Sequence, residues 1–226
     1  MKICVPIKVQ NMSALLPRIK LAESFDNVDM TEIWLDQVVD LEMEKIFKIR
    51  KKSMIGVCKT LEEKGNFRGN NFERLGVLID FVESGGEYVD IGGGLDDFEL
   101  LRRFVDRYCN TPLQIIGSFH DFEKTPNFDV LEKVIEERLK FGANIIKIAT
   151  KINYEFDLEI LEKCVEKILS LNLNPIVLGM GALGKRTRMG EGVFAKNFLT
   201  FAALHEKEKT AEGQMILKKS FISKYV

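Results

Sequence analysis

The sequence is poor in the residues that build metal centres and disulfide frameworks. It contains only two histidines, His120 and His205, and none of its four cysteines forms a Cys-x-x-Cys pair with another. A zinc site made of several histidines is therefore not expected. Four isolated cysteines in a chain of 226 residues are typical of core side chains in a reducing compartment.

Long apolar runs and an excess of one charge are also missing. No segment approaches the roughly 18 apolar residues of a membrane span, and the residues after Met1 lack the apolar core of a signal peptide. Lys and Arg number 33 against 34 Asp and Glu, so the basic excess that nucleic-acid binding needs is absent. These features predict a cytoplasmic globular protein that binds neither membranes nor nucleic acid.

What the sequence has is a regular alternation of short apolar runs and amphipathic segments. Leucine, isoleucine and valine recur with helical spacing in 72–82, 130–141 and 158–171, and 215–226 is expected to form the last helix. The apolar runs between the helices are of strand length. They are Lys2–Pro6, Val28–Leu35, Ser53–Cys58, Glu87–Ile91, Leu113–Ser118, Asn144–Ala149, Asn174–Gly179 and Phe198–Ala202.

Eight strand–helix units in about 250 residues are typical of a (β/α)8 barrel. We therefore predict an α/β fold with a single (β/α)8 barrel domain over residues 1–226, and no linker-like composition divides the chain. An open doubly wound sheet is the alternative. In a barrel the active site lies at the carboxyl ends of the strands, so polar residues there are the candidates for chemistry.

Lys147 is the first candidate, because it interrupts the run from Asn144 to Ala149. Strand alternation places Lys147 on the face opposite to Ile146 and Ile148, and the bulkier pair suits the helix layer. Lys147 would then point into the barrel, where desolvation lowers the pKa of an amine and favours Schiff-base chemistry. The alternative is a structural lysine paired with a barrel carboxylate.

Three other segments place polar groups near the same strand ends. His120 ends the preceding strand, and it is either a general acid/base or a residue that caps the loop through a hydrogen bond with Asp121. Glu32, Trp34 and Asp36 are expected to face the barrel, where the carboxylates either form a polar site or are neutralised by barrel cations. Lys59 is in phase with Val57 and is either a cation of the site or a solvated loop residue.

Of two glycine-containing segments, only one is a candidate binding site. The segment 179–188 combines glycines with three cations, which indicates an anion site or a flexible basic surface loop. The segment 90–94 lacks the spacing and the lysine of a nucleotide loop, and we interpret it as a tight strand-to-helix turn.

Taken in order, these motifs resemble the type I 3-dehydroquinate dehydratases, the Schiff-base barrel enzymes of the shikimate pathway. The matching segments cover nearly the whole chain, and four in the right order at strand ends form a specific pattern. They are Ser118-Phe-His-Asp-Phe122 with Thr125-Pro126, Gly142-Ala-Asn-Ile-Ile-Lys-Ile-Ala149, Met180-Gly181 to Arg188, and Thr200-Phe201 with Gly213-Gln214.

The resemblance implies a role for each matching residue. Lys147 would form the Schiff base with the substrate ketone, His120 would move the protons, and Glu63 would orient His120. Substrate contacts would come from Glu32, Lys59, Arg188, Thr210, Gln214 and the neighbouring Trp34. The implied reaction is a syn loss of water from 3-dehydroquinate, giving 3-dehydroshikimate. The implied partner is this small molecule, no metal or organic cofactor is implied, and a homodimer is expected.

The chain also departs from the family pattern. Glu32-Ile33-Trp34 stands where Glu-x-Arg is usual, so Trp34 replaces an arginine. Lys59 replaces another arginine, no acidic residue follows Asp90, and Glu212 replaces a proline before Gly213. A lysine cannot form a bidentate fork with a carboxylate. We expect Arg188 and Lys59 to lower the pKa of Lys147. The alternatives are another Schiff-base lyase or aldolase with an altered substrate, or a non-catalytic paralogue that binds a ligand.

Overall fold

The computed structural model describes residues 1–93 and 98–217 of the chain. The strands are β1 (Lys2–Ile7), β2 (Met30–Trp34), β3 (Ser53–Val57), β4 (Tyr88–Ile91), β5 (Gln114–Asp121), β6 (Ile145–Lys151), β7 (Asn174–Met180), β8 (Leu199–Ala203) and β9 (Met215–Ile216). The helices are α1 (Met12–Glu23), α2 (Met43–Ile49), α3 (Asn71–Glu83), α4 (Phe98–Tyr108), α5 (Phe128–Lys140), α6 (Phe156–Ser170) and α7 (Lys185–Met189). Short 3-10 helices are η1 (Leu35–Gln37), η2 (Gly192–Lys196) and η3 (Glu206–Glu208).

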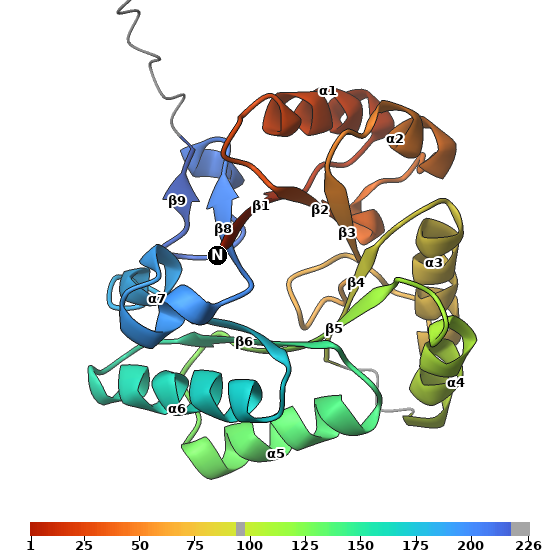
Figure 1. The fold of residues 1–226 in the computed structure, drawn as a ribbon. Helices are drawn as coiled ribbons and strands as arrows, with labels where there is room; N and C mark the ends of the chain where they lie inside the picture. The colour runs from red at the N-terminus through yellow and green to blue at the C-terminus, as the bar shows by residue number, and fades with distance from the viewer. Residues whose placement is uncertain (94–97, 218–226) are drawn as a thin grey trace, which may run out of the picture.

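The strands form one curled parallel sheet that the helices surround. Its order in the described residues is β7-β6-β5-β4-β3-β2-β1-β8-β9, and α1 to α6 lie outside the strands (Figure 1). All eight predicted strands are present within a few residues of their expected positions, and the three predicted helices over 72–82, 130–141 and 158–171 are confirmed as α3, α5 and α6.

Alternating side chains divide the interior into two apolar layers. One layer lies between the strands and the helices and includes Ile146, Ile148 and Leu161. The other lies inside the curl of the sheet and includes Ile145 and Ile176. Side chains that follow the inner layer along each strand therefore point into the space at the carboxyl ends of the strands.

Hydrogen-bonded caps fix where α3 and α5 begin. Asn70 accepts a hydrogen bond from the backbone N–H of Glu73, and the Glu73 carboxylate accepts one from the N–H of Asn70, which forms a capping box at α3. Asn127 accepts from the N–H of Val130 at the start of α5. Such caps satisfy N–H groups that have no partner within the helix.

The prediction of a closed barrel is met only in part, because no strand ladder joins β7 to β8 in the described residues. A side chain bridges this seam instead. Asn197 donates from Nδ2 to the carbonyl of Val177 at 2.9 Å and accepts from the N–H of Val177 at 2.8 Å. One backbone bond, from Phe198 N–H to Pro175 O at 2.7 Å, completes the seam. The sheet is thus curled round but interrupted between β7 and β8.

The prediction of a helix from Met215 is wrong where it can be compared. Met215 and Ile216 form β9, which pairs in parallel with Ala202 and Ala203 of β8. Leu217 continues this alignment by donating its N–H to the carbonyl of Ala203. The rest of that predicted helix, 218–226, lies outside the described residues.

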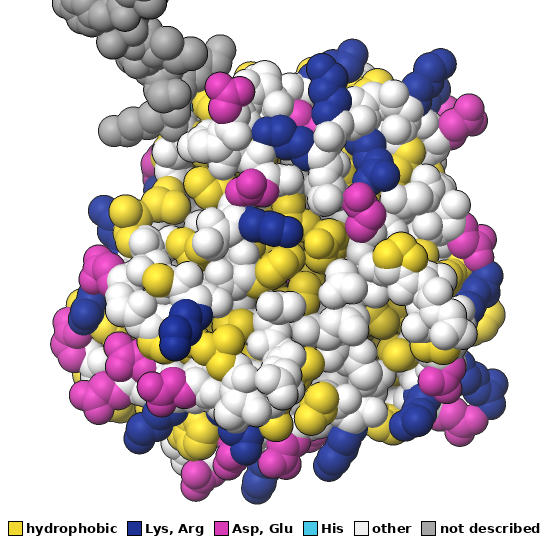
Figure 2. Space-filling view, in the orientation of Figure 1, with side chains coloured by type: hydrophobic (Ala, Val, Ile, Leu, Met, Phe, Trp, Pro, Cys, Tyr) yellow, Lys and Arg dark blue, Asp and Glu magenta, His cyan; other side chains and the backbone are white. Residues whose placement is uncertain are grey.

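Charged and hydrophobic side chains lie in different parts of the surface. Charged side chains gather around the periphery of the view in Figure 2, over the helices, and hydrophobic side chains show toward the middle. None of the helices in the described part of the chain is long and apolar enough to cross a membrane.

Candidate active site

Lys147 points into the space inside the curled sheet, as strand alternation predicts. It lies on β6 between inward-facing Ile145 and Ala149, and it is only 6% exposed. Its ammonium donates to Asp90 Oδ2 at 2.7 Å, lies 3.4 Å from Glu32 Oε2, and sits 4.6 Å from the ring centre of Phe201. A buried cation that touches two carboxylates stays charged at neutral pH.

The expectation of a lowered pKa at Lys147 is therefore wrong for the resting protein. Burial acts to lower the pKa, but the charges of Asp90 and Glu32 outweigh it and raise the pKa above that of an ordinary lysine. The sequence analysis left open that Lys147 pairs with a barrel carboxylate, and the structure shows this pairing, with carboxylates from two other strands.

Asp90 is the buried centre of a charge network that sequence analysis missed. Its fully buried carboxylate accepts from Lys147, from Lys59 Nζ at 2.8 Å and from Ser118 Oγ at 2.5 Å. Burial acts to raise its pKa, but Lys147 and Lys59 lower it far below the usual range. The alternation of side chains along β4 could have predicted that Asp90 points inward, because Asp90 is in phase with Tyr88, which packs on the inner layer.

Glu63 follows β3 and joins this network to the histidine. Its carboxylate accepts from Arg74 Nη2 at 2.8 Å and from Lys59 Nζ at 3.3 Å. Burial acts to raise its pKa, but the charge of Lys59, contact with His120 and the charge of Arg74 together lower it to about 2. Arg74 is itself 1% exposed, so Glu63 is held as a carboxylate by two buried cations.

His120 lies at the end of β5, one strand away from Lys147. Its Nδ1 is 3.6 Å from Glu63 Oε1, which is too long for a hydrogen bond, and this nitrogen has no other partner in the described residues. Burial lowers the pKa of His120, although Glu63 opposes the shift. The imidazole is therefore neutral at pH 7 and able to accept a proton.

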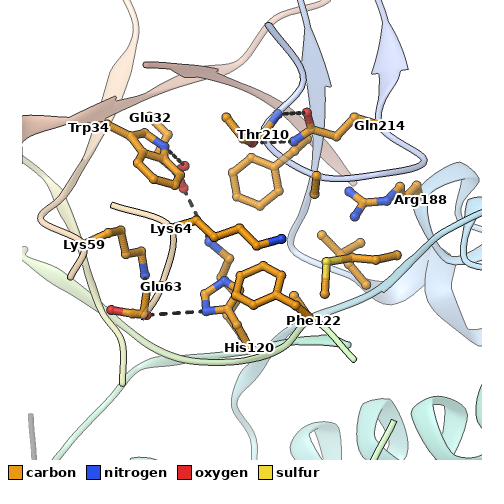
Figure 3. Close-up of a pocket in the computed structure, with 16 residues that line it drawn as sticks. Glu32, Trp34, Lys59, Glu63, Lys64, His120, Phe122, Arg188, Thr210 and Gln214 are labelled. Atoms are coloured by element: carbon orange, nitrogen blue, oxygen red, sulfur yellow. Dashed lines mark hydrogen bonds and ion pairs between the residues drawn. The ribbon is translucent and has the colours of Figure 1, made fainter. Parts of the chain in front are cut away.

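Arg188 supplies positive charge at the opposite wall of the pocket (Figure 3). It lies in α7, is 2% exposed, and donates from Nε to the carbonyl of Gly179 at 2.9 Å. Burial lowers its pKa to about 10. No carboxylate pairs with it among residues 1–93 and 98–217, so the segment 179–188 brings an uncompensated cation into the pocket.

Thr210 and Gln214 come from the loop between β8 and β9. Gln214 donates from Nε2 to Thr210 Oγ1 at 2.9 Å and accepts from the N–H of Thr210 at the same distance. The two side chains are thereby fixed relative to each other at the pocket wall. Both present polar atoms beside Ala211 and Phe201.

All nine predicted site residues line this one cavity. It contains about 570 Å³ of space free of atoms, including its open mouth. The lining also includes Lys64, Phe122, Leu178 and Met180, which sequence reasoning did not select. In the described residues no group of three or more His, Cys, Asp or Glu side chains is placed to hold a metal ion.

Comparison with known proteins now identifies the family. The family model described as Type I 3-dehydroquinase matches residues 3–219. The chain belongs to the type I 3-dehydroquinase family. Its activity is accordingly that of a hydro-lyase acting on 3-dehydroquinate.

Curated relatives match nearly the full length of the chain. It is 33% identical over 218 residues to the 3-dehydroquinate dehydratase of Methanocaldococcus jannaschii, covering 94% of this chain and 93% of that one. It is 32% identical over 222 residues to that of Methanococcus maripaludis strain C7, covering 96% and 95%.

Solved structures share the fold. The 3-dehydroquinate dehydratase of Geobacillus kaustophilus aligns with a TM-score of 0.82 at 20% identity, covering 95% of this chain and 86% of that one. The type I enzyme of Clostridium difficile, solved with covalently modified comenic acid, aligns with a TM-score of 0.82 at 21% identity, covering 95% and 87%.

Trp34 and Lys59, two of the departures noted in the sequence, both contact other side chains. Trp34 donates from Nε1 to Glu32 Oε1 at 3.0 Å, and the ammonium of Lys8 lies 4.4 Å from the centre of its ring. Lys59 is only 3% exposed and is fully engaged with Asp90 and Glu63. Lys59 is therefore a buried component of the charge network, although it also borders the pocket.

Proposed function

We propose that this chain dehydrates 3-dehydroquinate through a Schiff base on Lys147. The observation that carries the proposal is the buried amine of Lys147, which faces the pocket together with a neutral histidine. An imine on a lysine acts as the electron sink for removal of a neighbouring proton.

The first step needs a neutral amine at Lys147. Because the resting ammonium is stabilised by Asp90 and Glu32, it must pass a proton on before it attacks the ketone carbon. His120 lines the same pocket and is neutral, so it is suited to accept this proton. The nitrogen attacks the carbonyl carbon, and the carbonyl oxygen leaves as water after taking one proton from the amine and one from the protonated His120. A protonated imine and a neutral His120 remain.

The same carboxylates then favour the intermediate. A protonated imine carries one positive charge at the position of the former ammonium. Asp90 at 2.7 Å and Glu32 at 3.4 Å from that nitrogen already face it. Charges fixed before the reaction stabilise a cationic intermediate without rearrangement.

His120 would carry out the proton transfers on the substrate. It removes the proton alpha to the imine, and the bonding electrons move toward the imine nitrogen. The returning electrons expel the hydroxyl group, which leaves as water after protonation by His120. Glu63 at 3.6 Å is placed to hold the imidazole and to stabilise its protonated form. Hydrolysis of the imine then releases 3-dehydroshikimate and the free lysine.

Arg188, Thr210 and Gln214 would hold the substrate ring. The guanidinium of Arg188 has no carboxylate partner within residues 1–93 and 98–217, so it suits the substrate carboxylate, and the hydroxyl and amide of the other two suit ring oxygens. Glu32 accepts from Trp34 and lies against the lysine, so it would contact hydroxyl groups near the imine. These contacts set the geometry on which the rate depends.

Four expectations about the whole protein remain proposals. They are a single domain over residues 1–226, the closed form of the eight-stranded barrel, a homodimer and a cytoplasmic location. The curled sheet and the Asn197 bridge support closure of the barrel. The scattered cysteines support a reducing compartment.

The test is to trap the imine. The protein is incubated with 3-dehydroquinate and borohydride, and intact mass and peptide mapping locate any adduct. We expect the adduct on Lys147 and conjugated enone product when borohydride is omitted. Lys147→Ala should form no adduct, and His120→Ala should form the adduct but turn over poorly. Normal turnover by either variant would contradict the assigned roles.

A further inference from the structure

The pocket contains four cations, and only two of them have carboxylate partners. Lys59 and Lys147 are paired with buried carboxylates. Arg188 and Lys64 have no carboxylate within ion-pair distance in the described ranges 1–93 and 98–217. An anionic substrate entering the pocket would therefore meet two uncompensated positive charges.

The Lys64 side chain reaches over the pocket. Its ammonium lies 3.8 Å from the centre of the Phe122 ring, and Phe122 stacks on His120 with ring centres 5.9 Å apart. Figure 3 shows Lys64 extending across the cavity toward the side on which Arg188 lies. The aromatic face steadies the cation without neutralising its charge.

The backbone at Lys64 is held in an unusual conformation. Its φ of 62° lies in the left-handed region, which costs about 1–2 kcal/mol for a residue other than glycine. The Lys64 N–H donates to the carbonyl of Leu61 at 3.0 Å, and its own carbonyl accepts from Lys8 Nζ at 2.6 Å. A strained residue that its surroundings fix so firmly at a pocket mouth points to a function.

The loop that carries Lys64 is anchored at both ends. Asp36 accepts from the N–H of Lys59 at 2.9 Å and from the N–H of Asn66 at 2.8 Å. A side chain at Gly65 would come within 2.0 Å of the Lys59 carbonyl, so only glycine fits this close turn. The turn therefore presents Lys64 from a fixed frame, although Lys64 itself is exposed.

We propose that Lys64 is a second cationic contact for the carboxylate of the substrate, acting opposite Arg188. The inference rests on the proposed function and adds a specificity-determining residue to it. Glu212 also feels the charge of Lys64, but the Glu212 carboxylate is hydrogen-bonded to Lys151. The ammonium of Lys64 thus stays available to a ligand. It would draw anionic substrate to the mouth and hold its carboxylate together with Arg188.

The test compares steady-state kinetics on 3-dehydroquinate for the natural protein and the Lys64→Met, Lys64→Arg and Lys124→Met variants. Lys124 is exposed on the loop after β5 and is not among the residues that line the pocket. It therefore controls for loss of one positive charge at the same end of the barrel. Thermal unfolding confirms that each variant is folded.

We expect Lys64→Met to raise KM about tenfold, equivalent to about 1.4 kcal/mol, while kcat stays within about threefold. The dependence of kcat/KM on ionic strength should weaken as well. Lys64→Arg should restore most of the affinity, and Lys124→Met should behave as the natural protein. An unchanged KM in Lys64→Met, or a fall in kcat alone, would overturn the inference while leaving the proposed function intact. Absence of turnover by the natural protein would instead overturn both.

Discussion

Replacing Asp90 by Asn tests whether the buried charge network stabilises the fold and holds the proton on Lys147. The substitution keeps the shape of the side chain but removes the negative charge that faces both Lys147 and Lys59. Two buried ammonium groups would then share the remaining carboxylates, Glu32 and Glu63. Breaking a buried ion pair in this way typically costs about 3–5 kcal/mol.

That cost is large for a domain of this size. Proteins are stable by only about 5–15 kcal/mol, and in a domain of this length each kcal/mol shifts Tm by about 2–4 °C. Asp90→Asn should therefore lower Tm by about 6–20 °C. The assay is thermal unfolding followed by circular dichroism.

The same variant should change the chemistry in a defined direction. Asp90 is the strongest influence raising the pKa of Lys147, so its loss lowers that pKa. The pH profile of borohydride trapping should then move to lower pH, because more of the amine is neutral there. Asp157→Asn is the matched control, since Asp157 is buried and accepts N–H bonds from Asn153 and Tyr154 at the start of α6. The control should lose stability without moving the trapping profile. This account would be refuted if Asp90→Asn lowered the free energy of unfolding by less than about 1 kcal/mol and left the pH profile of trapping unchanged.

Three further changes test other parts of the structure. Asn197→Ala leaves the N–H and carbonyl of Val177 without partners, which should cost about 2–6 kcal/mol in denaturant unfolding; a loss below about 0.5 kcal/mol would mean that the bridge is dispensable. Folding lowers the pKa values of Glu63 and Asp90, so both carboxylates stabilise the fold above their unfolded pKa values of about 4. This stability is lost as pH falls through the folded pKa, which is about 2 for Glu63. In an acid titration, Glu63→Gln should therefore show a shallower loss of stability than the natural protein. Trp34→Arg should preserve or improve turnover, because a guanidinium can also donate to Glu32; a large fall in kcat/KM would show that the indole is integral to the pocket.

The strands and the inward side chains could be predicted because both depend on local patterns. Short apolar runs located β1 to β8, and a period of two placed Lys147 and Glu32 inside the sheet. The positions of Arg188 and Gln214 came from the family resemblance rather than from periodicity. The predicted site residues, selected from local patterns and from the resemblance, all line one pocket.

The remaining features depend on contacts between distant segments. Asp90, which raises the pKa of Lys147, is 57 residues away in the chain. A local sequence pattern cannot predict a contact between residues so far apart. Asp90 stands before a run of glycines, which hid its inward phase. Met215 and Ile216 form a strand because β8 offers them a free neighbour, whereas their apolar character alone fits a helix equally well.

The side chains along the seam also matter for the stability of the fold. A buried backbone N–H or carbonyl group that loses its hydrogen-bond partner costs about 1–3 kcal/mol. On β7, Asn197 bonds both backbone groups of Val177, while Thr187 accepts from the N–H of Gly179 and Arg188 donates to its carbonyl. Substitutions at Arg188 are therefore expected to lower the free energy of unfolding as well as to weaken substrate binding.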